Sequence, residues 1–136
     1  MKHLILLLAT SLLTATSAWA ETPVPTTEQV VEHHMQAGNE QNVAAVMHDY
    51  AANAILVAPD GVHKGKQAIR ASYEQLASGP KSTITADRKV FEGEVGYVAW
   101  TMNAGQPGAV HGTDTFIVHH GKIVVQTVTM FQPGQK

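Results

Sequence analysis

A single carboxylate, Asp114, lies in the otherwise apolar and β-branched stretch 110–118. A carboxylate inside a buried strand is costly unless it has a partner or a chemical role. His34 follows Val30 and Val31 by four and three residues, so on a helix it faces where they face. If strand and helix pack together, Asp114 and His34 point into one interior. Such a pair could act as a general acid or base, contact a carbonyl or carboxylate ligand, or form a purely structural pair.

Large side chains with polar tips predict the wall of a pocket around these two residues. Tyr50 and Trp100 each combine an apolar ring with a polar group that needs a partner. Met102 and Phe116 supply further apolar surface. A mostly apolar cavity with two convergent polar groups is typical of a small-molecule site. We therefore predict that a small hydrophobic molecule is bound there.

Other polar residues are predicted to have no chemical role. The adjacent pairs His33-His34 and His119-His120 cannot chelate as pairs, because neighbouring side chains diverge on a helix or a strand. Asp49 is predicted to be a solvated charge. Lys66 and Arg70, a like-charge pair one helical turn apart, are predicted to be solvated too, although they could favour an anionic ligand near the entrance. No metal and no cofactor are predicted.

Composition limits the class of protein. The chain has 136 residues, enough for one domain, with 9 basic and 11 acidic residues and no basic stripe, so nucleic acid is not a predicted partner. Residues 1–20 have a basic start, a short apolar run and Ala18-Trp19-Ala20 before the expected cleavage point, which is typical of a secretory signal peptide. The run is too short for a convincing membrane span. A periplasmic or secreted protein without cysteines is predicted, with no membrane contact after cleavage.

The pattern of apolar residues predicts helices first and strands afterwards. A mobile lead-in at 21–25 precedes the folded domain, 26–133. Three helices are expected before a meander of strands, which gives an α+β fold with the helices on one face of a strongly curved antiparallel sheet. Val62 to Lys64 is a further, brief strand. The expected helices are 27–38, 43–50 and 66–77, and the expected strands are 54–58, 83–91, 95–104, 110–118 and 122–132.

This order of elements resembles the nuclear transport factor 2-like superfamily, which includes the SnoaL-like polyketide cyclases and the ketosteroid isomerases. The segments 42–59 and 65–73 match its pattern of helix, strand, glycine turn and helix, and Asp114-Thr115-Phe116-Ile117-Val118 with Gly121-Lys122-Ile123-Val124 matches its last hairpin. The resemblance implies a cone-shaped, cystatin-like sheet with a pocket in its mouth. It also implies a homodimer, which both faces of the last strand suit.

Position by position, the resemblance gives a partial isomerase site. The buried aspartic acid of the ketosteroid isomerases falls on Asp114 and its tyrosine partner on His34. The general base, an aspartate before a proline, falls on Ala58 before Pro59, so the usual catalytic base is absent. We predict an exported SnoaL-like domain that binds a small, mostly apolar molecule. The alternative is an isomerase or cyclase-like enzyme acting on an enolisable carbonyl compound. The predicted catalytic residues are His34 and Asp114, and the predicted ligand-binding residues are Tyr50, Ala58, Trp100, Met102 and Phe116.

Overall fold

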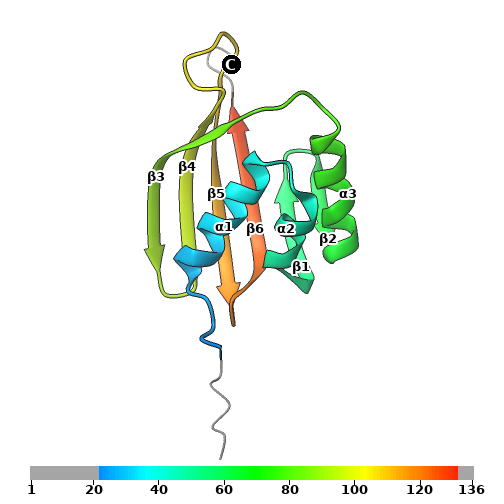
Figure 1. The fold of residues 1–136 in the computed structure, drawn as a ribbon, viewed down its shortest axis with the longest axis vertical. Helices are drawn as coiled ribbons and strands as arrows, with labels where there is room; N and C mark the ends of the chain where they lie inside the picture. The colour runs from blue at the N-terminus through cyan, green and yellow to red at the C-terminus, as the bar shows by residue number, and fades with distance from the viewer. Residues whose placement is uncertain (1–21, 132–136) are drawn as a thin grey trace, which may run out of the picture.

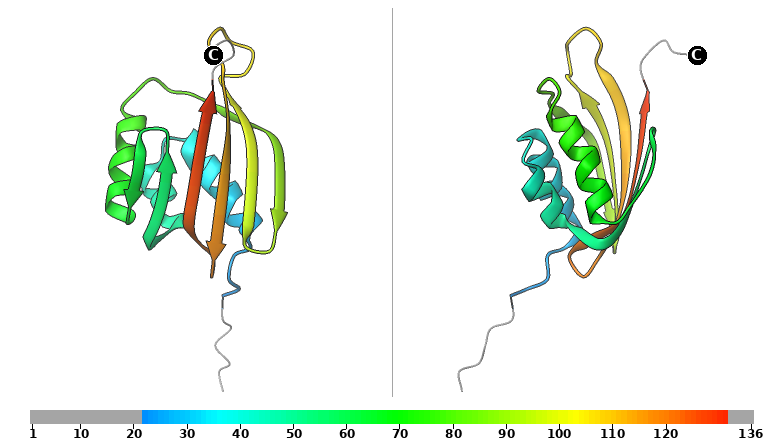
Figure 2. Two further views of the ribbon diagram at one scale, coloured as in Figure 1. Left: turned by 180° about the vertical axis from the view of Figure 1, so that it is seen from behind. Right: turned by 90° about the vertical axis from the view of Figure 1, so that its right-hand side faces the viewer.

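The computed structural model describes residues 22–131, and the predicted signal peptide lies outside this range. The described chain forms a layer of helices packed on one face of a curved sheet (Figures 1 and 2). No helix within the described range is both long and apolar enough to span a membrane. The elements are α1 (Thr27–Asn39), α2 (Val43–Asp49), β1 (Tyr50–Ala58), β2 (Gly61–Lys64), α3 (Lys66–Ala77), β3 (Ile84–Glu92), β4 (Val95–Met102), β5 (Val110–His119) and β6 (Lys122–Phe131).

The helices begin where the sequence provides caps. The side chain of Thr26 accepts a hydrogen bond from the backbone of Gln29, whose side chain accepts one from the Thr26 backbone, so a capping box opens α1. Asn42 caps α2 by accepting a hydrogen bond from the backbone of Ala45. Gly65 precedes α3 with a φ of 81°, a conformation that favours glycine.

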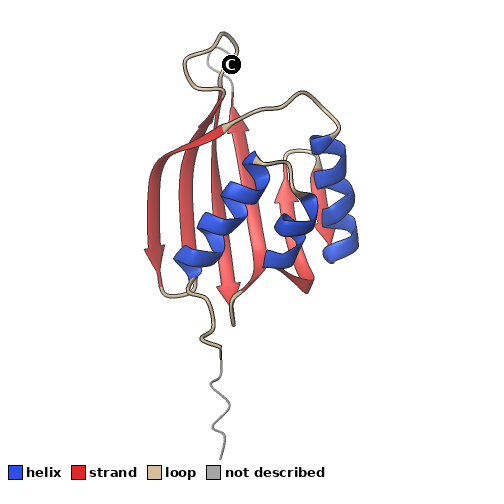
Figure 3. Cartoon of the chain, in the orientation of Figure 1, coloured by secondary structure: helices blue, strands red, loops and turns tan. Residues whose placement is uncertain are grey.

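The sheet has six strands in the order β2-β1-β6-β5-β4-β3 (Figure 3). The α+β class and the three helices are confirmed, but the expectation of a wholly antiparallel sheet was wrong. β6 lies beside β1 and runs parallel to it, whereas all other neighbours are antiparallel. The alternation of apolar residues fixes which face of a strand is buried and leaves its direction open. The sheet is therefore mixed, and it is not closed.

The core lies between the helices and the concave face of the sheet. Phe116 from β5 and Ile123 from β6 are fully buried against Val31 from α1 and Met47 from α2. The helical spacing of Ile69, Tyr73 and Leu76 predicts that all three face inward, but Leu76 on α3 is 68 % exposed and forms part of the cavity mouth.

Candidate functional site

A cavity of about 680 Å³ opens between α3, the start of α2 and the concave face of the sheet. Its volume falls in the range of small-molecule pockets. Apolar residues from β1, β4 and β6 form most of the wall, and the segment after α3 forms part of the mouth. The lining residues are Gly38, Gln41, Val43, Val46, Leu56, Ala58, Pro59, Asp60, Ser72, Tyr73, Gln75, Leu76, Ala77, Gly79, Pro80, Ser82, Ile84, Trp100, Met102, Asp114, Gln126, Val128 and Met130.

Asp114 supplies the carboxylate of the cavity. Two neighbouring strands hold it: Trp100 Nε1 of β4 donates to Oδ1 at 2.9 Å, and Gln126 Nε2 of β6 donates to Oδ2 at 2.9 Å. Burial raises the pKa of Asp114 to about 6, and the two donated hydrogen bonds oppose that rise. Near neutral pH this carboxyl can therefore exchange a proton or accept a hydrogen bond from a ligand.

Gly112 allows the Trp100 ring to lie against β5. A Cβ atom at this position would be 2.2 Å from Cζ2 of Trp100 and 2.6 Å from the backbone oxygen of Thr129. Gly112 and Trp100 are directly paired across β4 and β5, two residues before Asp114. Because Gly112 has no side chain, the indole can occupy the position from which its N–H reaches the Asp114 carboxylate.

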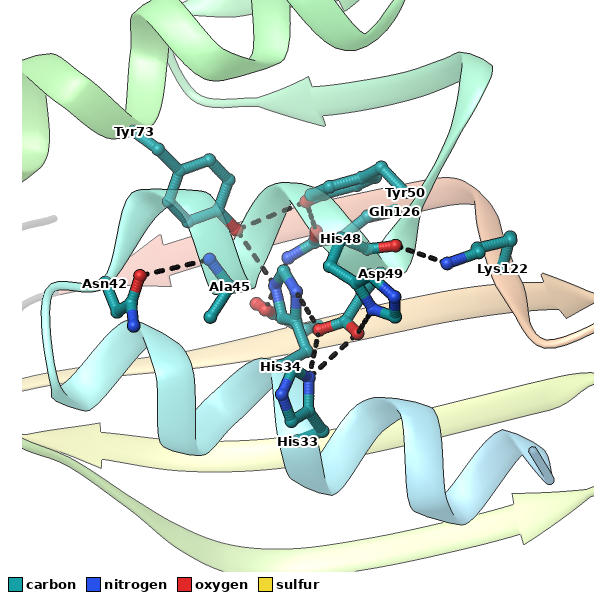
Figure 4. Close-up of polar contacts among 11 residues, drawn as sticks. His33, His34, Asn42, Ala45, His48, Asp49, Tyr50, Tyr73, Lys122 and Gln126 are labelled. Atoms are coloured by element: carbon teal, nitrogen blue, oxygen red, sulfur yellow. Dashed lines mark hydrogen bonds and ion pairs between the residues drawn. The ribbon is translucent and has the colours of Figure 1, made fainter.

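A chain of hydrogen bonds leads from Gln126, which donates to Asp114, through Tyr50 and Tyr73 to His34 (Figure 4). Tyr50 donates to Oε1 of Gln126, the Tyr50 and Tyr73 hydroxyls are 3.2 Å apart, and the Tyr73 hydroxyl is 3.0 Å from Nε2 of His34. Since the Tyr50 proton goes to Gln126, Tyr73 must donate to Tyr50, and His34 Nε2–H must donate to Tyr73. Every proton in the chain therefore points toward Asp114.

Burial keeps the members of this chain neutral. It raises the pKa of Tyr73 to about 12 and the pKa of Tyr50 well above its usual value. Burial, with the nearby His33, lowers the pKa of His34 to about 3. The direction of the chain leaves Nδ1 of His34 as an acceptor, and this buried nitrogen has no hydrogen-bond partner within the described structure.

The expected direct pair of His34 and Asp114 does not form. His34 lies next to Asp49 instead, with 3.7 Å between Nδ1 and Oδ2. It is linked to Asp114 only through the two tyrosines and Gln126. His34 and Asp114 both face the interior, as expected. They come from a helix and a strand on opposite sides of the core, so other side chains lie between them.

Asp49 was wrongly expected to be solvated. Only 4 % of this residue is exposed, and its carboxylate contacts Nδ1 of His33 at 2.8 Å and Nδ1 of His48 at 3.7 Å (Figure 4). The turn from α2 into β1 directs its side chain under α1, where these histidines replace water. Within residues 22–131 no group of three acidic, histidine or cysteine residues is placed to hold a metal ion.

The predicted site residues divide into two sets. Ala58, Trp100, Met102 and Asp114 line the cavity. His34, Tyr50 and Phe116 lie behind its wall, where His34 and Tyr50 belong to the hydrogen-bond chain and Phe116 belongs to the core.

Two residues of the site, Tyr73 and Gln126, were not predicted. Tyr73 was assigned to the inward face of its helix without a role. Gln126 could have been predicted from the sequence, because it is the one amide in the mostly apolar run 123–128. A buried amide needs a hydrogen-bond partner, as a buried carboxylate does.

Of the charged residues predicted near the entrance, only Asp60 lines the cavity. Asp60, in the turn after Ala58, is mostly exposed and lies 3.2 Å from His63, and this hydrogen bond lowers the pKa of Asp60. Lys66 and Arg70 are absent from the lining, and Arg70 lies 3.7 Å from Glu74 on the outside of α3. The lining of the cavity therefore includes no basic residue.

Three helices on a curved mixed sheet, with a carboxylate in an apolar cavity, define a cone-shaped α+β fold with an internal site. The sequence profile of the SnoaL-like domain matches residues 31–126, so the chain belongs to the SnoaL-like domain family. No curated protein sequence matches the chain significantly.

Solved structures share this fold at low sequence identity. An NTF2-like protein of unknown function from Cytophaga hutchinsonii is 19 % identical, with a TM-score of 0.67, and the match covers 82 % of this chain and 94 % of that one. A putative polyketide cyclase from Sinorhizobium meliloti is 18 % identical, with a TM-score of 0.67 and coverage of 74 % and 93 %. The epoxide hydrolase/cyclase-like enzyme SalBIII, described in pyran ring formation in the polyether salinomycin, is 21 % identical, with a TM-score of 0.66 and coverage of 77 % and 90 %. At these identities the likeness establishes the fold.

Proposed function

We propose that this domain binds a small, mostly apolar molecule in the cavity, with Asp114 as its direct polar contact. The observation that carries the proposal is the Asp114 carboxyl facing an otherwise largely apolar cavity of about 680 Å³. His34 contributes indirectly, because it donates into the chain of hydrogen bonds that ends at Asp114. Burying an ionisable group in such a place costs stability, and a bound polar group would offset that cost.

Fluorescence of Trp100 provides the test. The chain has two tryptophans and Trp19 belongs to the proposed signal peptide, so Trp100, at the cavity, is the only reporter in a protein that begins at Glu21. We expect saturable quenching or enhancement on titration with 1-adamantanemethanol, an apolar probe that does not absorb with tryptophan. Ala58→Phe, which adds a ring to the cavity wall, should abolish the response. Val62→Phe, on an exposed position of β2, should leave it unchanged. An equal response in both variants would contradict binding in this cavity.

A second candidate function is acid–base catalysis on an enolisable carbonyl compound. It is favoured by the pKa of Asp114, about 6, and by neighbours described as cyclase-like. We expect the protein to accelerate exchange of the α-hydrogens of 2-tetralone for deuterium, followed by NMR, and Asp114→Asn to remove the acceleration. Ala58→Asp, which places a carboxylate at the base position implied by the ketosteroid isomerase resemblance, should increase it. No exchange in either the wild type or Ala58→Asp would exclude this function.

We further propose that the protein is exported. The support is the sequence of residues 1–20, with its apolar run and small residues at the expected cleavage point. Expression in a Gram-negative host should give a periplasmic product that begins at Glu21, as read by N-terminal sequencing. A full-length cytoplasmic product would contradict export.

A further inference from the structure

The charged residues of the cavity are all acidic. Among the lining residues only Asp114 and Asp60 are charged, and neither lysine, arginine nor histidine is present. Asp60 is in the turn that follows Ala58, and Asp114 is held by Trp100 and Gln126. A ligand entering this cavity therefore passes one carboxylate and meets another, without a compensating cation from the wall.

The hydrogen-bond donors beside Asp114 are already engaged. Trp100 and Gln126 both donate to the carboxylate, and the Tyr73 proton is directed to Tyr50. The opposite orientation of the Gln126 amide would place its oxygen against the ionised Asp114 carboxylate, two acceptors with no proton between them, so it would break that bond. The strongest polar group left to a ligand is thus an acceptor, the Asp114 carboxylate.

We propose, on the premise that this cavity is the binding site, that its ligand is an apolar amine that binds as its ammonium ion against Asp114. An ammonium group brings a donor for the Asp114 carboxylate and the positive charge that the cavity lining lacks. A carboxylate or phosphate would be desolvated beside the like charge of Asp114, whose two neighbouring donors are already engaged. A neutral alcohol supplies the donor without the charge, and a ketone supplies neither.

Three probes with one apolar body separate these cases. We would titrate 1-adamantanemethylamine, 1-adamantanemethanol and 1-adamantanecarboxylate into the protein that begins at Glu21 by calorimetry at about pH 8, where Asp114 is ionised. We expect the amine to bind tightest, the alcohol about tenfold more weakly, and the carboxylate not measurably. Equal affinities, or tightest binding of the carboxylate, would overturn the amine proposal and leave binding in the cavity intact. Failure of all three to bind would contradict the proposed function itself.

Substitution of the carboxylate tests its role directly. Asp114→Asn should weaken binding of the amine by at least about tenfold and change that of the alcohol much less. Asp60→Asn is the matched control, because Asp60 is mostly exposed, and it should change the amine affinity less than about threefold. An unchanged amine affinity in a folded Asp114→Asn protein would overturn the proposal.

A pH titration keeps the proposal testable if Asp114→Asn does not fold. In the wild-type protein, protonation of Asp114 removes the negative charge, so the affinity for the amine should fall as pH decreases through about 6. The affinity for the alcohol should change little over the same range. An amine affinity that is independent of pH between about 5 and 8 would contradict contact with Asp114.

Discussion

His34 and Asp114 affect stability with opposite signs as pH changes. The pKa of His34 is about 3 in the folded protein and ordinarily 6.5, so between these values only the unfolded chain binds the proton and stability rises with pH. The pKa of Asp114 is about 6 in the folded protein and ordinarily 3.8, so between these values only the folded chain binds the proton and stability falls as pH rises. The two effects oppose each other from about pH 4 to 6.

Single substitutions should expose each effect. Relative to wild type, His34→Gln should give a free energy of unfolding that falls more steeply with pH between about 4 and 6, and Asp114→Asn one that rises more steeply. One proton corresponds to a slope of at most about 1.4 kcal/mol per pH unit. Urea denaturation at a series of pH values measures both slopes. Changes of the same sign in the two variants would contradict these pKa directions.

Gly112→Ala should destabilise the protein through Trp100. The added methyl group would lie 2.2 Å from the indole and 2.6 Å from a backbone oxygen, so ring and strand must both shift, at a cost of about 1–3 kcal/mol or more. Gly38→Ala is the control, because no atom lies within 4 Å of its Cβ position in α1, and it should stabilise by about 0.5–1 kcal/mol. Chemical denaturation followed by Trp100 fluorescence measures both. A neutral Gly112→Ala would show that the indole is not confined.

At the residue scale the sequence predicted burial better than contacts. Asp114 and Trp100 were placed correctly on the concave face by strand alternation. Alternation gives no information on what separates two inward residues, so the tyrosine and glutamine bridge between Asp114 and His34 was missed. Asp49 was misassigned because its position at the end of a short helix gave no indication that α1 would cover it.

Asn39 joins the end of α1 to the edge strand β3. Its amide donates to the backbone oxygen of Ile84 at 2.9 Å and accepts from the Ile84 N–H at 2.8 Å, as a neighbouring strand would. The segment between α3 and β3, which contributes Gly79, Pro80 and Ser82 to the cavity mouth, ends at this contact. A single side chain thus ties the helical layer to the mouth.

Asn39→Ala should loosen that mouth. Loss of two half-buried hydrogen bonds is expected to cost about 1–2 kcal/mol of stability. Backbone hydrogen exchange, measured by mass spectrometry, should accelerate at residues 79–85 more than elsewhere. Gln36→Ala is the control, because its side chain contacts only the exposed Glu40 and should contribute less than about 0.5 kcal/mol. Equal exchange in both variants would show that Asn39 does not hold the segment.

The elements themselves were largely predictable, and β1 is the informative exception. We expected this strand to begin at Ala54, because Ala51-Ala52-Asn53 has little strand preference. In the structure it begins at Tyr50. β1 pairs with β6 with a register shift between Tyr50 and Ile55. This pairing holds residues 51–53 in a strand despite their weak strand preference. The parallel contact of β1 with β6 depends on the whole chain, so no local pattern could reveal it.

At the scale of the whole molecule, the middle of the convex face of the sheet carries no charged residue. The helices lie on the other face (Figure 2), and within residues 22–131 no element covers this one. Strand alternation places no aspartate, glutamate, lysine or arginine on it across β4, β5 and β6 from Val125 onward, whereas the edge strand β3 places Arg88 and Glu92 there and its Asp87 accepts a hydrogen bond from the outward Thr101. The outward residues are Val95, Tyr97, Ala99, Thr101, His111, Thr113, Thr115, Ile117, Val125, Thr127, Thr129 and Phe131.

We propose that a second copy of this chain covers the convex face, in keeping with the homodimer implied by the family resemblance. Val95 is 43 % exposed and Phe131 55 %, and an uncharged surface of this breadth is typical of an interface core. Thr115, between Tyr97 and Thr127, occupies the middle of the face, so Thr115→Arg should place two like charges at the interface of a symmetric dimer and give a monomer. Sedimentation velocity at micromolar concentration measures the change. Gln67→Arg, on an exposed position of α3 on the opposite side of the sheet, should leave the dimer intact. A monomeric wild-type protein would contradict the dimer, and a dimeric Thr115→Arg would move it to another surface.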